Sequence, residues 1–350
     1  MTQENGNYLF LWEKTAEKEI RLLRVFGESG AVVIPEEISG FTVTEIGNYC
    51  FSKQRLPDTV ICYTACINQQ EKNAILYEKN TEELLNKFPV LHEISEKYIE
   101  QIKLPATVKK IGACAFYNCT RMKKIVLYPG LSEAGSDAFM NCLNLKKIDM
   151  LASVEEKTGL KQLLAQIKWQ VEVAFYHPSD TLEAQFLFPE YYESYDEIGP
   201  AHIFELNLSG EGFRARQCFK DGVFLTEPYD EIFEKACVEE SKEVLAAMAW
   251  DRLFVKKDLS DEARSNYESY LKDEGKIIVN NFIKKRRLTE LVFFFREGYG
   301  TEELLKEAIY AASNEQWTEG TAGLLSLKEE LFAQSEREKT IKERYSFDDF

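Results

Sequence analysis

The fold is decided by the stretch Ile111–Cys119 (IGACAFYNC), which recurs 23 residues later as Ala134–Cys142 (AGSDAFMNC). A fixed period of this length predicts a solenoid, in which each coil buries its apolar edge only against neighbouring coils. Such a stack presents an extended surface, so the repeat also suggests binding. It does not indicate which partner is bound.

The strands of these coils keep the same spacing. Apolar residues alternate along three segments that lie one period apart, at Ile102 and Leu104, Ile125 and Leu127, and Ile148 and Met150. Alternate side chains of a strand point to the same face of the sheet. We therefore expect these side chains to point into the core.

Phe116 and Phe139 occupy the same position in successive coils. We expect both rings to lie in the core, one coil above the other. Gly112 and Gly135 recur in the same way. We expect them at corners where the backbone needs conformational freedom.

An earlier copy of the motif, Ile46–Phe51 (IGNYCF), lies more than one period upstream. Gly47 and Gly112 are 65 residues apart, which is one period of 23 plus 42 further residues. The sequence therefore predicts an insertion at about 54–100, in which Thr81 begins a helix. Alternating segments at 8–13 and 20–26 predict a β-hairpin that caps the solenoid.

The segment Leu104–Cys119 (LPATVKKIGACAFYNC) resembles the BspA-type leucine-rich repeat, and the resemblance extends over about 32–54 and 100–150. It implies short strands stacked into a curved solenoid that acts mainly through protein contacts. Many members of that family are surface-exposed. Two positions depart from the pattern, because Ala134 replaces the usual isoleucine and Tyr128 precedes Pro129 where leucine is expected.

After residue 150 the predicted secondary structure changes twice, first to a β-rich region and then to helices. A connecting helix is predicted at 151–165, followed by strand-like segments at 169–176, 184–188, 201–208 and 213–219 that form a small antiparallel sheet. From about 229 the apolar period becomes helical, with Ser260 and Thr301 as N-cap residues. The segment Leu288–Glu290 returns 29 residues later as Trp317–Glu319, which weakly resembles ankyrin-like helix pairs.

The predicted fold class is therefore α+β, in three parts. Residues 1–150 form a short leucine-rich repeat solenoid with an N-terminal β-hairpin cap and a helical insertion at about 54–100. Residues 151–228 form a β-rich middle domain, and residues 229–350 form a helical repeat-like domain with a charged tail.

Composition and charge limit the classes of partner and the cellular compartment that we expect for this protein. The 350 residues carry a formal net charge of −16, which repels nucleic acid and anionic membranes. Eight cysteines are too few for a disulfide scaffold. The N-terminal residues do not read as a secretory signal. We expect a cytoplasmic protein in which Cys114, Cys119 and Cys142 are reduced and face the core.

No motif points to catalysis. His92, His177 and His202 lack metal-ligand spacing, and Cys62 and Cys66 lack a second cysteine pair. The sequence contains no phosphate loop, serine elbow or His-Glu-x-x-His box. The basic run 284–287 is more typical of a helix C-terminus than of a nucleic-acid contact. We expect no enzyme activity, no cofactor and no metal.

Two clusters are candidates for binding a protein partner. The first, here called the lysine ladder, consists of Lys123, Lys124, Lys146 and Lys147 on neighbouring coils. Stacked lysines repel one another, so this face would favour an acidic partner or the chain's own acidic segments. Lysines at exposed strand positions can equally serve to keep the strand soluble and to block pairing at its edge. The second consists of Tyr191, Tyr192 and Tyr195, which lie in an acidic stretch. These rings either form a contact surface for a partner or pack against the chain's own residues at a strand edge.

The leading hypothesis is a non-catalytic intracellular scaffold that binds an unknown protein through the repeat face and the helical array. One alternative is a cell-surface or secreted adhesin. Another is an enzyme or ligand-binding protein with a site around Tyr191, Tyr195, His202 and Arg214. Convergence of these four side chains on a pocket would favour the last.

Overall fold

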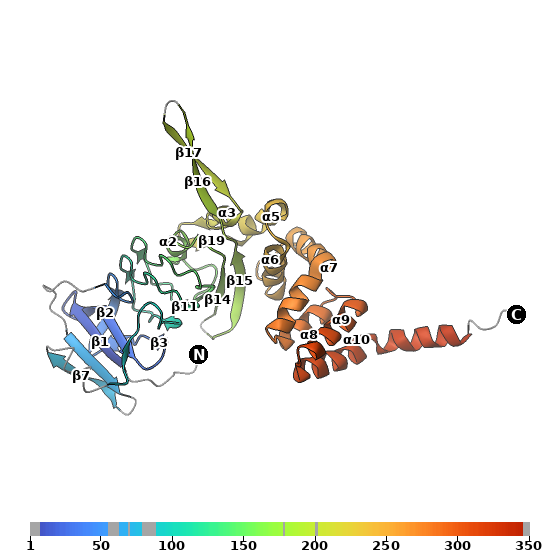
Figure 1. Ribbon diagram of the computed structural model, residues 1–350, viewed down its shortest axis with the longest axis horizontal. Coiled ribbons are helices and arrows are strands. Elements are labelled where there is room, and N and C mark those ends of the chain that lie inside the picture. The colour runs from blue at the N-terminus through green and yellow to red at the C-terminus, as the bar shows by residue number, and fades with distance from the viewer. Residues whose placement is uncertain are drawn as a thin grey trace. The chain divides into compact units, whose positions relative to one another are not determined.

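The computed structural model describes residues 8–54, 63–68, 71–78, 89–177, 179–199 and 202–345, and it describes no side chains for 63–68, 71–78 and 333–345. The chain divides into two compact units, Met1–Lys235 and Ala236–Phe350 (Figure 1). The three-part division predicted from the sequence stays a prediction.

One wall of the solenoid is a six-stranded sheet in the order β15-β14-β13-β11-β9-β3. Its strands are β3 (Ala31–Val33), β9 (Gln101–Lys103), β11 (Lys124–Leu127), β13 (Lys147–Met150), β14 (Val171–Tyr176) and β15 (Leu182–Phe188). All neighbours pair in parallel except β14 and β15, which are antiparallel. Ile125 pairs with Ile102 on one side and Ile148 on the other, so the sequence period is the register of the sheet.

The second wall belongs to a nine-stranded sheet. Its coil strands β5 (Phe41–Ile46), β10 (Lys110–Ile111) and β12 (Glu133–Ala134) pair in parallel. Ile111 lies between Ile46 and Ala134, which confirms the 65-residue step around the insertion. The strands β1 (Tyr8–Lys14) and β2 (Glu19–Gly27) form an antiparallel hairpin, and β2 pairs with β5. The predicted N-terminal hairpin cap is therefore confirmed.

The described part of the insertion extends this sheet. Strands β6 (Tyr63–Asn68) and β7 (Glu71–Glu78) form a hairpin, and β6 pairs with β1. The short strands β4 (Glu37–Ile38) and β8 (His92–Glu93) pair with β5 and β2. The helix expected from Thr81 lies outside the described residues.

Aromatic rings run through the core of the coils. The ring centroids of Phe51 and Phe116 are 4.9 Å apart, and those of Phe116 and Phe139 are 5.2 Å apart. The ring planes are nearly parallel, at 4° and 10°. All three side chains are fully buried. The predicted stacking of one coil on the next is confirmed.

The recurring glycines have a different role from the one predicted. Gly112 and Gly135 do not have positive φ, whereas Cys114 and Asp137, two residues after each glycine, do. A Cβ on Gly112 would lie 2.5 Å from Asn48 Oδ1, and one on Gly135 would lie 2.4 Å from the Ala113 nitrogen. The glycines are needed because successive coils approach too closely for a side chain.

The middle of the chain departs most from prediction. The connecting helix is only α2 (Leu160–Leu164), and β14 and β15 complete the solenoid wall instead of starting a separate sheet. The separate antiparallel pair is β16 (Tyr192–Ile198) with β17 (Ile203–Ser209), which projects away from the coils (Figure 1). The prediction of a strand at 213–219 is wrong. This segment contains most of the helix α3 (Gly212–Ala215) and the first residue of β18 (Phe219–Lys220), which pairs with β19 (Val223–Phe224).

The remaining elements are helical, as predicted. They are α4 (Thr226–Asp230), α5 (Ile232–Glu239), α6 (Lys242–Phe254), α7 (Asp261–Lys284), α8 (Leu288–Arg296), α9 (Glu302–Asn314) and α10 (Thr318–Tyr345). The Oγ of Ser260 accepts a hydrogen bond from the Ala263 nitrogen at 3.2 Å, and Thr301 Oγ1 accepts one from the Leu304 nitrogen at 3.2 Å. Both predicted N-caps are confirmed. The likeness to ankyrin repeats stays a prediction.

Candidate functional site

The lysine ladder lies on the first solenoid wall, and most of its charge is compensated there. Lys124 forms an ion pair with Asp149 on the next coil, and Lys147 Nζ lies 2.9 Å from Glu172. Burial alone would lower the pKa of Lys147, but the charge and hydrogen bond of Glu172 outweigh it and raise that pKa. Within the described residues, the ladder is therefore largely a set of cross-strand ion pairs.

The outer members of the ladder are more open. Lys123 Nζ lies 3.3 Å from a Glu100 carboxylate oxygen, and Lys146 is exposed. Ion pairs this exposed contribute about 0–1 kcal/mol to stability. Binding of a partner by Lys123, Lys124, Lys146 and Lys147 stays a prediction.

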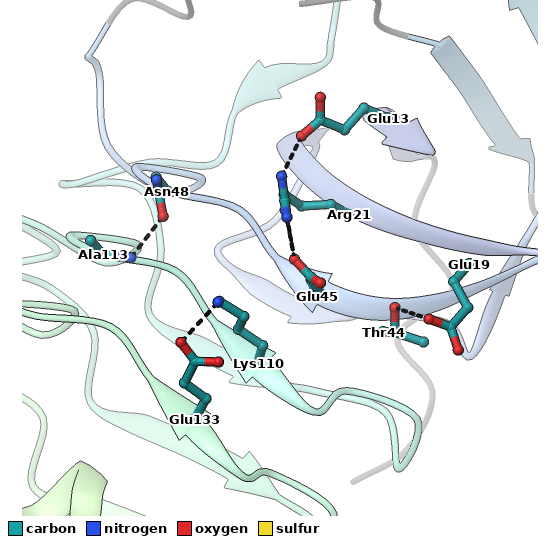
Figure 2. Close-up of polar contacts among 9 residues, drawn as sticks. All are labelled: Glu13, Glu19, Arg21, Thr44, Glu45, Asn48, Lys110, Ala113 and Glu133. Carbon is teal, nitrogen blue, oxygen red and sulfur yellow. Dashed lines mark hydrogen bonds and ion pairs between the residues drawn. The ribbon is translucent and has the colours of Figure 1, made fainter. Parts of the chain in front are cut away.

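The second wall repeats this arrangement (Figure 2). Lys110 Nζ lies 2.8 Å from Glu133 on the next coil, and Arg21 bridges Glu13 and Glu45 at 2.8 and 2.7 Å. Both walls thus place opposite charges on neighbouring strands, which is the favourable cross-strand pairing for charged side chains.

The β16–β17 hairpin is built differently, because its side chains are exposed on both faces. Its large apolar side chains have exposed fractions between 40% and 64%, namely Tyr192, Tyr195, Ile198, Ile203, Phe204, Leu206 and Leu208. Large exposed apolar patches are uncommon on proteins that act alone, and they mark contact sites. The hairpin is the strongest candidate for a functional surface in the described part of the chain.

The pairing register sorts these side chains into two faces. Tyr195 pairs with Leu206, and the neighbouring pairs are Glu193 with Leu208 and Glu197 with Phe204. Paired residues share a face, so Phe204, Leu206 and Leu208 form an apolar row along β17. The opposite face carries the pair Asp196 and Glu205. The first face thus combines the apolar row with Glu193 and Glu197 of β16. The opposite face, here called the polar face, is polar at its centre and carries Tyr192 at one end and the pair Ile198 and Ile203 at the other.

The three predicted tyrosines lie in different environments. Tyr192 and Tyr195 are exposed on β16, whereas Tyr191 is buried at the base of the hairpin. The Tyr191 ring packs edge-on against Phe213 with centroids 5.6 Å apart, and burial raises the pKa of its hydroxyl. Only Tyr192 and Tyr195 are open to direct contact with a partner.

A buried arginine fixes the base of the hairpin. Arg216 is 2% exposed, and burial lowers the pKa of its guanidinium to about 10. Its guanidinium donates hydrogen bonds of 2.6–2.9 Å to the backbone carbonyls of Ile167, Trp169, Pro189 and Gly212. The carbonyls of Ile167 and Trp169 lie just before β14, whereas those of Pro189 and Gly212 flank the hairpin, before β16 and after β17. Arg216 thus ties the hairpin to the last coil, and it explains the helical turn found where a strand was predicted.

Phe204, Leu206 and Leu208 were not predicted as site residues. Their signal is the alternation in 203–209 (IFELNLS), within the strand predicted at 201–208, and such alternation is typical of a strand with a buried apolar face. The strand is present, but the face is exposed.

The four residues considered for a ligand site do not converge. Tyr191 precedes β16 and His202 precedes β17, so the two lie at opposite ends of the hairpin, about 20 Å apart at ~3.3 Å per residue. His202 hydrogen-bonds Glu197, and Arg214 pairs with Glu211.

The other candidate sites considered from the sequence are weaker than the hairpin. Within the residues that the structure describes, no cluster of three potential metal ligands is present. Cys62 lies outside the described residues, and the side chain of Cys66 is not described. Arg287, in the basic run, pairs with Glu290 at 2.6 Å. None of the described helices combines the length and apolar character that crossing a membrane requires.

Comparison with known proteins identifies the coils. Residues 94–159 match the family described as BspA type Leucine rich repeat region (6 copies). A solved structure of a leucine-rich repeat protein from T. pallidum is 22% identical, with a TM-score of 0.26 over 43% of this chain and 54% of that chain. The match thus spans about half the length of that protein. No curated protein matches the chain.

Proposed function

We propose that this chain, whose residues 94–159 are a BspA-type leucine-rich repeat region, is a non-catalytic scaffold that binds another protein. Leucine-rich repeat regions generally act through protein contacts. In the proposal, the solenoid is the rigid support and the β16–β17 hairpin is the contact element. The observation that carries the proposal is the apolar row of Phe204, Leu206 and Leu208, which is exposed on a hairpin held firmly at its base.

Energetics support a contact role for the hairpin. A two-stranded hairpin alone is only marginally stable in water, so its apolar face gains from a covering surface. Full burial of each large apolar side chain would contribute about 1.5–3 kcal/mol. The outer strand edges also present main-chain groups that an added strand can pair with.

Cytoplasmic localisation is part of the same proposal. The Cys119 thiol donates to the Phe51 carbonyl at 3.3 Å, and the Cys142 thiol donates to the Phe116 carbonyl at 3.0 Å. Both bonds need a reduced thiol, which a reducing compartment maintains. Fractionation of native cells tests the point. Recovery of the protein at the cell surface would favour the adhesin alternative instead.

The contact role is tested by affinity purification from the native cell, followed by mass spectrometry. We expect Phe204→Ser with Leu206→Ser to lose a partner that the unmodified chain retains in stoichiometric amounts. Met140→Ser with Leu143→Ser is the matched control, because these side chains are similarly exposed, at 47% and 61%, but lie on the solenoid. The control should retain the partner.

Two other results would redirect the proposal. Undiminished capture by the hairpin variant would remove the hairpin as the contact element. Loss of capture on changing Lys123, Lys124, Lys146 and Lys147 to glutamate, but not on changing the hairpin, would assign contact to the lysine ladder.

A further inference from the structure

We infer that the partner of the hairpin is an extended segment in which apolar residues alternate with lysine or arginine, and that it adds as a strand along the outer edge of β17. This inference rests on the proposed function and specifies the chemistry of the partner.

The first observation is the open edge of β17. The hairpin is a sheet of two strands in the described part of the chain, so β17 has a neighbour only on its β16 side. An unpaired strand edge is a ready template for strand addition. An added strand would continue the alternation of β17, with one set of its side chains beside Phe204, Leu206 and Leu208 and the other beside Glu205.

The apolar row sets the first half of the partner's pattern. Phe204, Leu206 and Leu208 point to one face and are 40–64% exposed. Side chains that arrive on this face gain most if they are apolar, because neighbouring residues across a strand pair pack together.

Charge sets the second half of the pattern. The strands β16 and β17 carry the carboxylates of Glu193, Asp196, Glu197 and Glu205, and their sequence contains no lysine or arginine. Asp196 and Glu205 are direct cross-strand partners, an arrangement that is destabilising for like charges. Asp196 accepts a hydrogen bond from Asn207 at 2.7 Å. Neither of these two carboxylates has a cation within ion-pair distance among the described residues.

Glu193 and Glu197 differ from this pair. Glu193 accepts from Lys168 at 2.7 Å, and Glu197 is hydrogen-bonded to His202. The uncompensated charge is therefore concentrated on the polar face, next to the strand edge. A lysine or arginine on the polar face of an added strand would lie beside Glu205 and relieve its repulsion with Asp196.

A second copy of this chain fits less well. Two β17 strands paired antiparallel about Leu206 would place Phe204 beside Leu208, which is favourable. The same pairing would join two chains that each carry a net charge of −16, and would place both Glu205 side chains on one face of the joined sheet. A basic segment meets the same apolar row without this repulsion.

The test uses the full chain and a short, labelled synthetic peptide that alternates valine and lysine. Fluorescence anisotropy should show binding about tenfold tighter than for a peptide of the same composition with its valines and lysines in separate blocks. N-methylation of alternate peptide bonds, on the side that faces β17, should abolish binding by removing main-chain hydrogen bonds.

Two variants locate the site. Asp196→Asn with Glu205→Gln should weaken binding of the alternating peptide about tenfold and reduce its salt dependence. Phe204→Ser with Leu206→Ser should weaken it at least as much. Glu36→Gln with Glu37→Gln removes the same amount of charge at exposed positions of the solenoid and should leave binding unchanged.

The opposing results are equally distinct. Equal affinity for the alternating and block peptides, or full affinity of the carboxylate variant, would overturn the inference and indicate bulk attraction to an acidic protein. A dimer in analytical ultracentrifugation that Leu206→Ser abolishes would assign the edge to a second copy and overturn it too. If either occurred while the hairpin variant still lost its native partner, the inference would fall and the proposed function would stand.

Discussion

The solenoid wall and the β16–β17 hairpin share one sequence pattern but place it in opposite environments. Ile102 and Ile148 alternate with polar residues, Ile125 lies between Lys124 and Val126, and all three isoleucines are fully buried. Phe204 and Leu206 alternate in the same way and are 64% and 47% exposed. Each wall strand is paired with a neighbouring strand and has buried apolar side chains, whereas the hairpin has no facing layer among the described residues. Alternation thus determines which side chains share a face, and the rest of the fold determines whether that face is covered.

The sharpest test of this contrast removes one ring from each region. Phe116→Ala should lower the free energy of unfolding by about 3–5 kcal/mol, because it leaves a cavity between Phe51 and Phe139. Phe204→Ala should change it by less than about 0.5 kcal/mol, since that ring is exposed. Equilibrium urea unfolding measures both. Similar losses from the two variants would show that the hairpin ring is covered in solution.

A second test addresses the junction of the two regions. Arg216→Met should cost about 3 kcal/mol, because buried carbonyls lose a charged donor. It should also speed proteolytic cleavage at the base of the hairpin. Arg121→Met is the control, since its side chain is exposed and its pair with Glu100 is worth about 0–1 kcal/mol. An unchanged cleavage rate in Arg216→Met would mean that other contacts position the hairpin.

Glycine substitutions extend the contrast to the backbone. Gly135→Ala should cost about 2 kcal/mol by overpacking, because its Cβ would press on the backbone of the preceding coil. Gly199→Ala, in the turn region of the hairpin, should be neutral within about 0.5 kcal/mol, since nothing lies within 4 Å of the added carbon. Thermal unfolding of the two variants is a direct comparison. Equal melting temperatures would contradict the close approach of the coils.

Taken per pH unit, the smallest expected effect is that of alkaline pH on the Cys50 thiol. Burial raises the pKa of the Cys50 thiol from 9.0 to about 12. Above pH 9 the unfolded chain releases this proton while the folded chain retains it, so stability is complete below pH 9 and declines as pH rises towards 12. Loss of this one proton from the unfolded chain should lower the free energy of unfolding by about 1.4 kcal/mol per pH unit in that range. Cys50→Ala should show a correspondingly shallower decline, and an unchanged slope would place the thiol in contact with water.

Much of the solenoid was predictable because its contacts repeat. Residues that are 23 apart in the sequence pair directly in the sheet, and Phe116 and Phe139, which share a position in the repeat, stack on each other. The step from Ile148 to its partner Val173 is 25 residues and carries no motif, so the last parallel strand was assigned to a separate sheet. The turn at Gly212–Ala215 depends on carbonyls that Arg216 gathers from distant segments, which no local pattern reveals.

The candidate site was predicted only in part. Tyr192 and Tyr195 were singled out and are exposed, and Tyr191 was grouped with them although it is buried. The row on β17 was missed because an apolar alternation normally indicates a covered face. Its exposure depends on the absence of a facing layer, which is a property of the whole fold and not of the strand.

The reversal of strand direction at β15 has a consequence for how such a protein can change in length. A new parallel coil cannot be stacked beyond an antiparallel terminal strand in the same register, so duplicated units must enter upstream of Val171. Each duplication would displace the anchored hairpin from the N-terminal cap by one strand spacing, about 4.8 Å. The array would then act as a molecular ruler, with copy number setting the reach between its two ends.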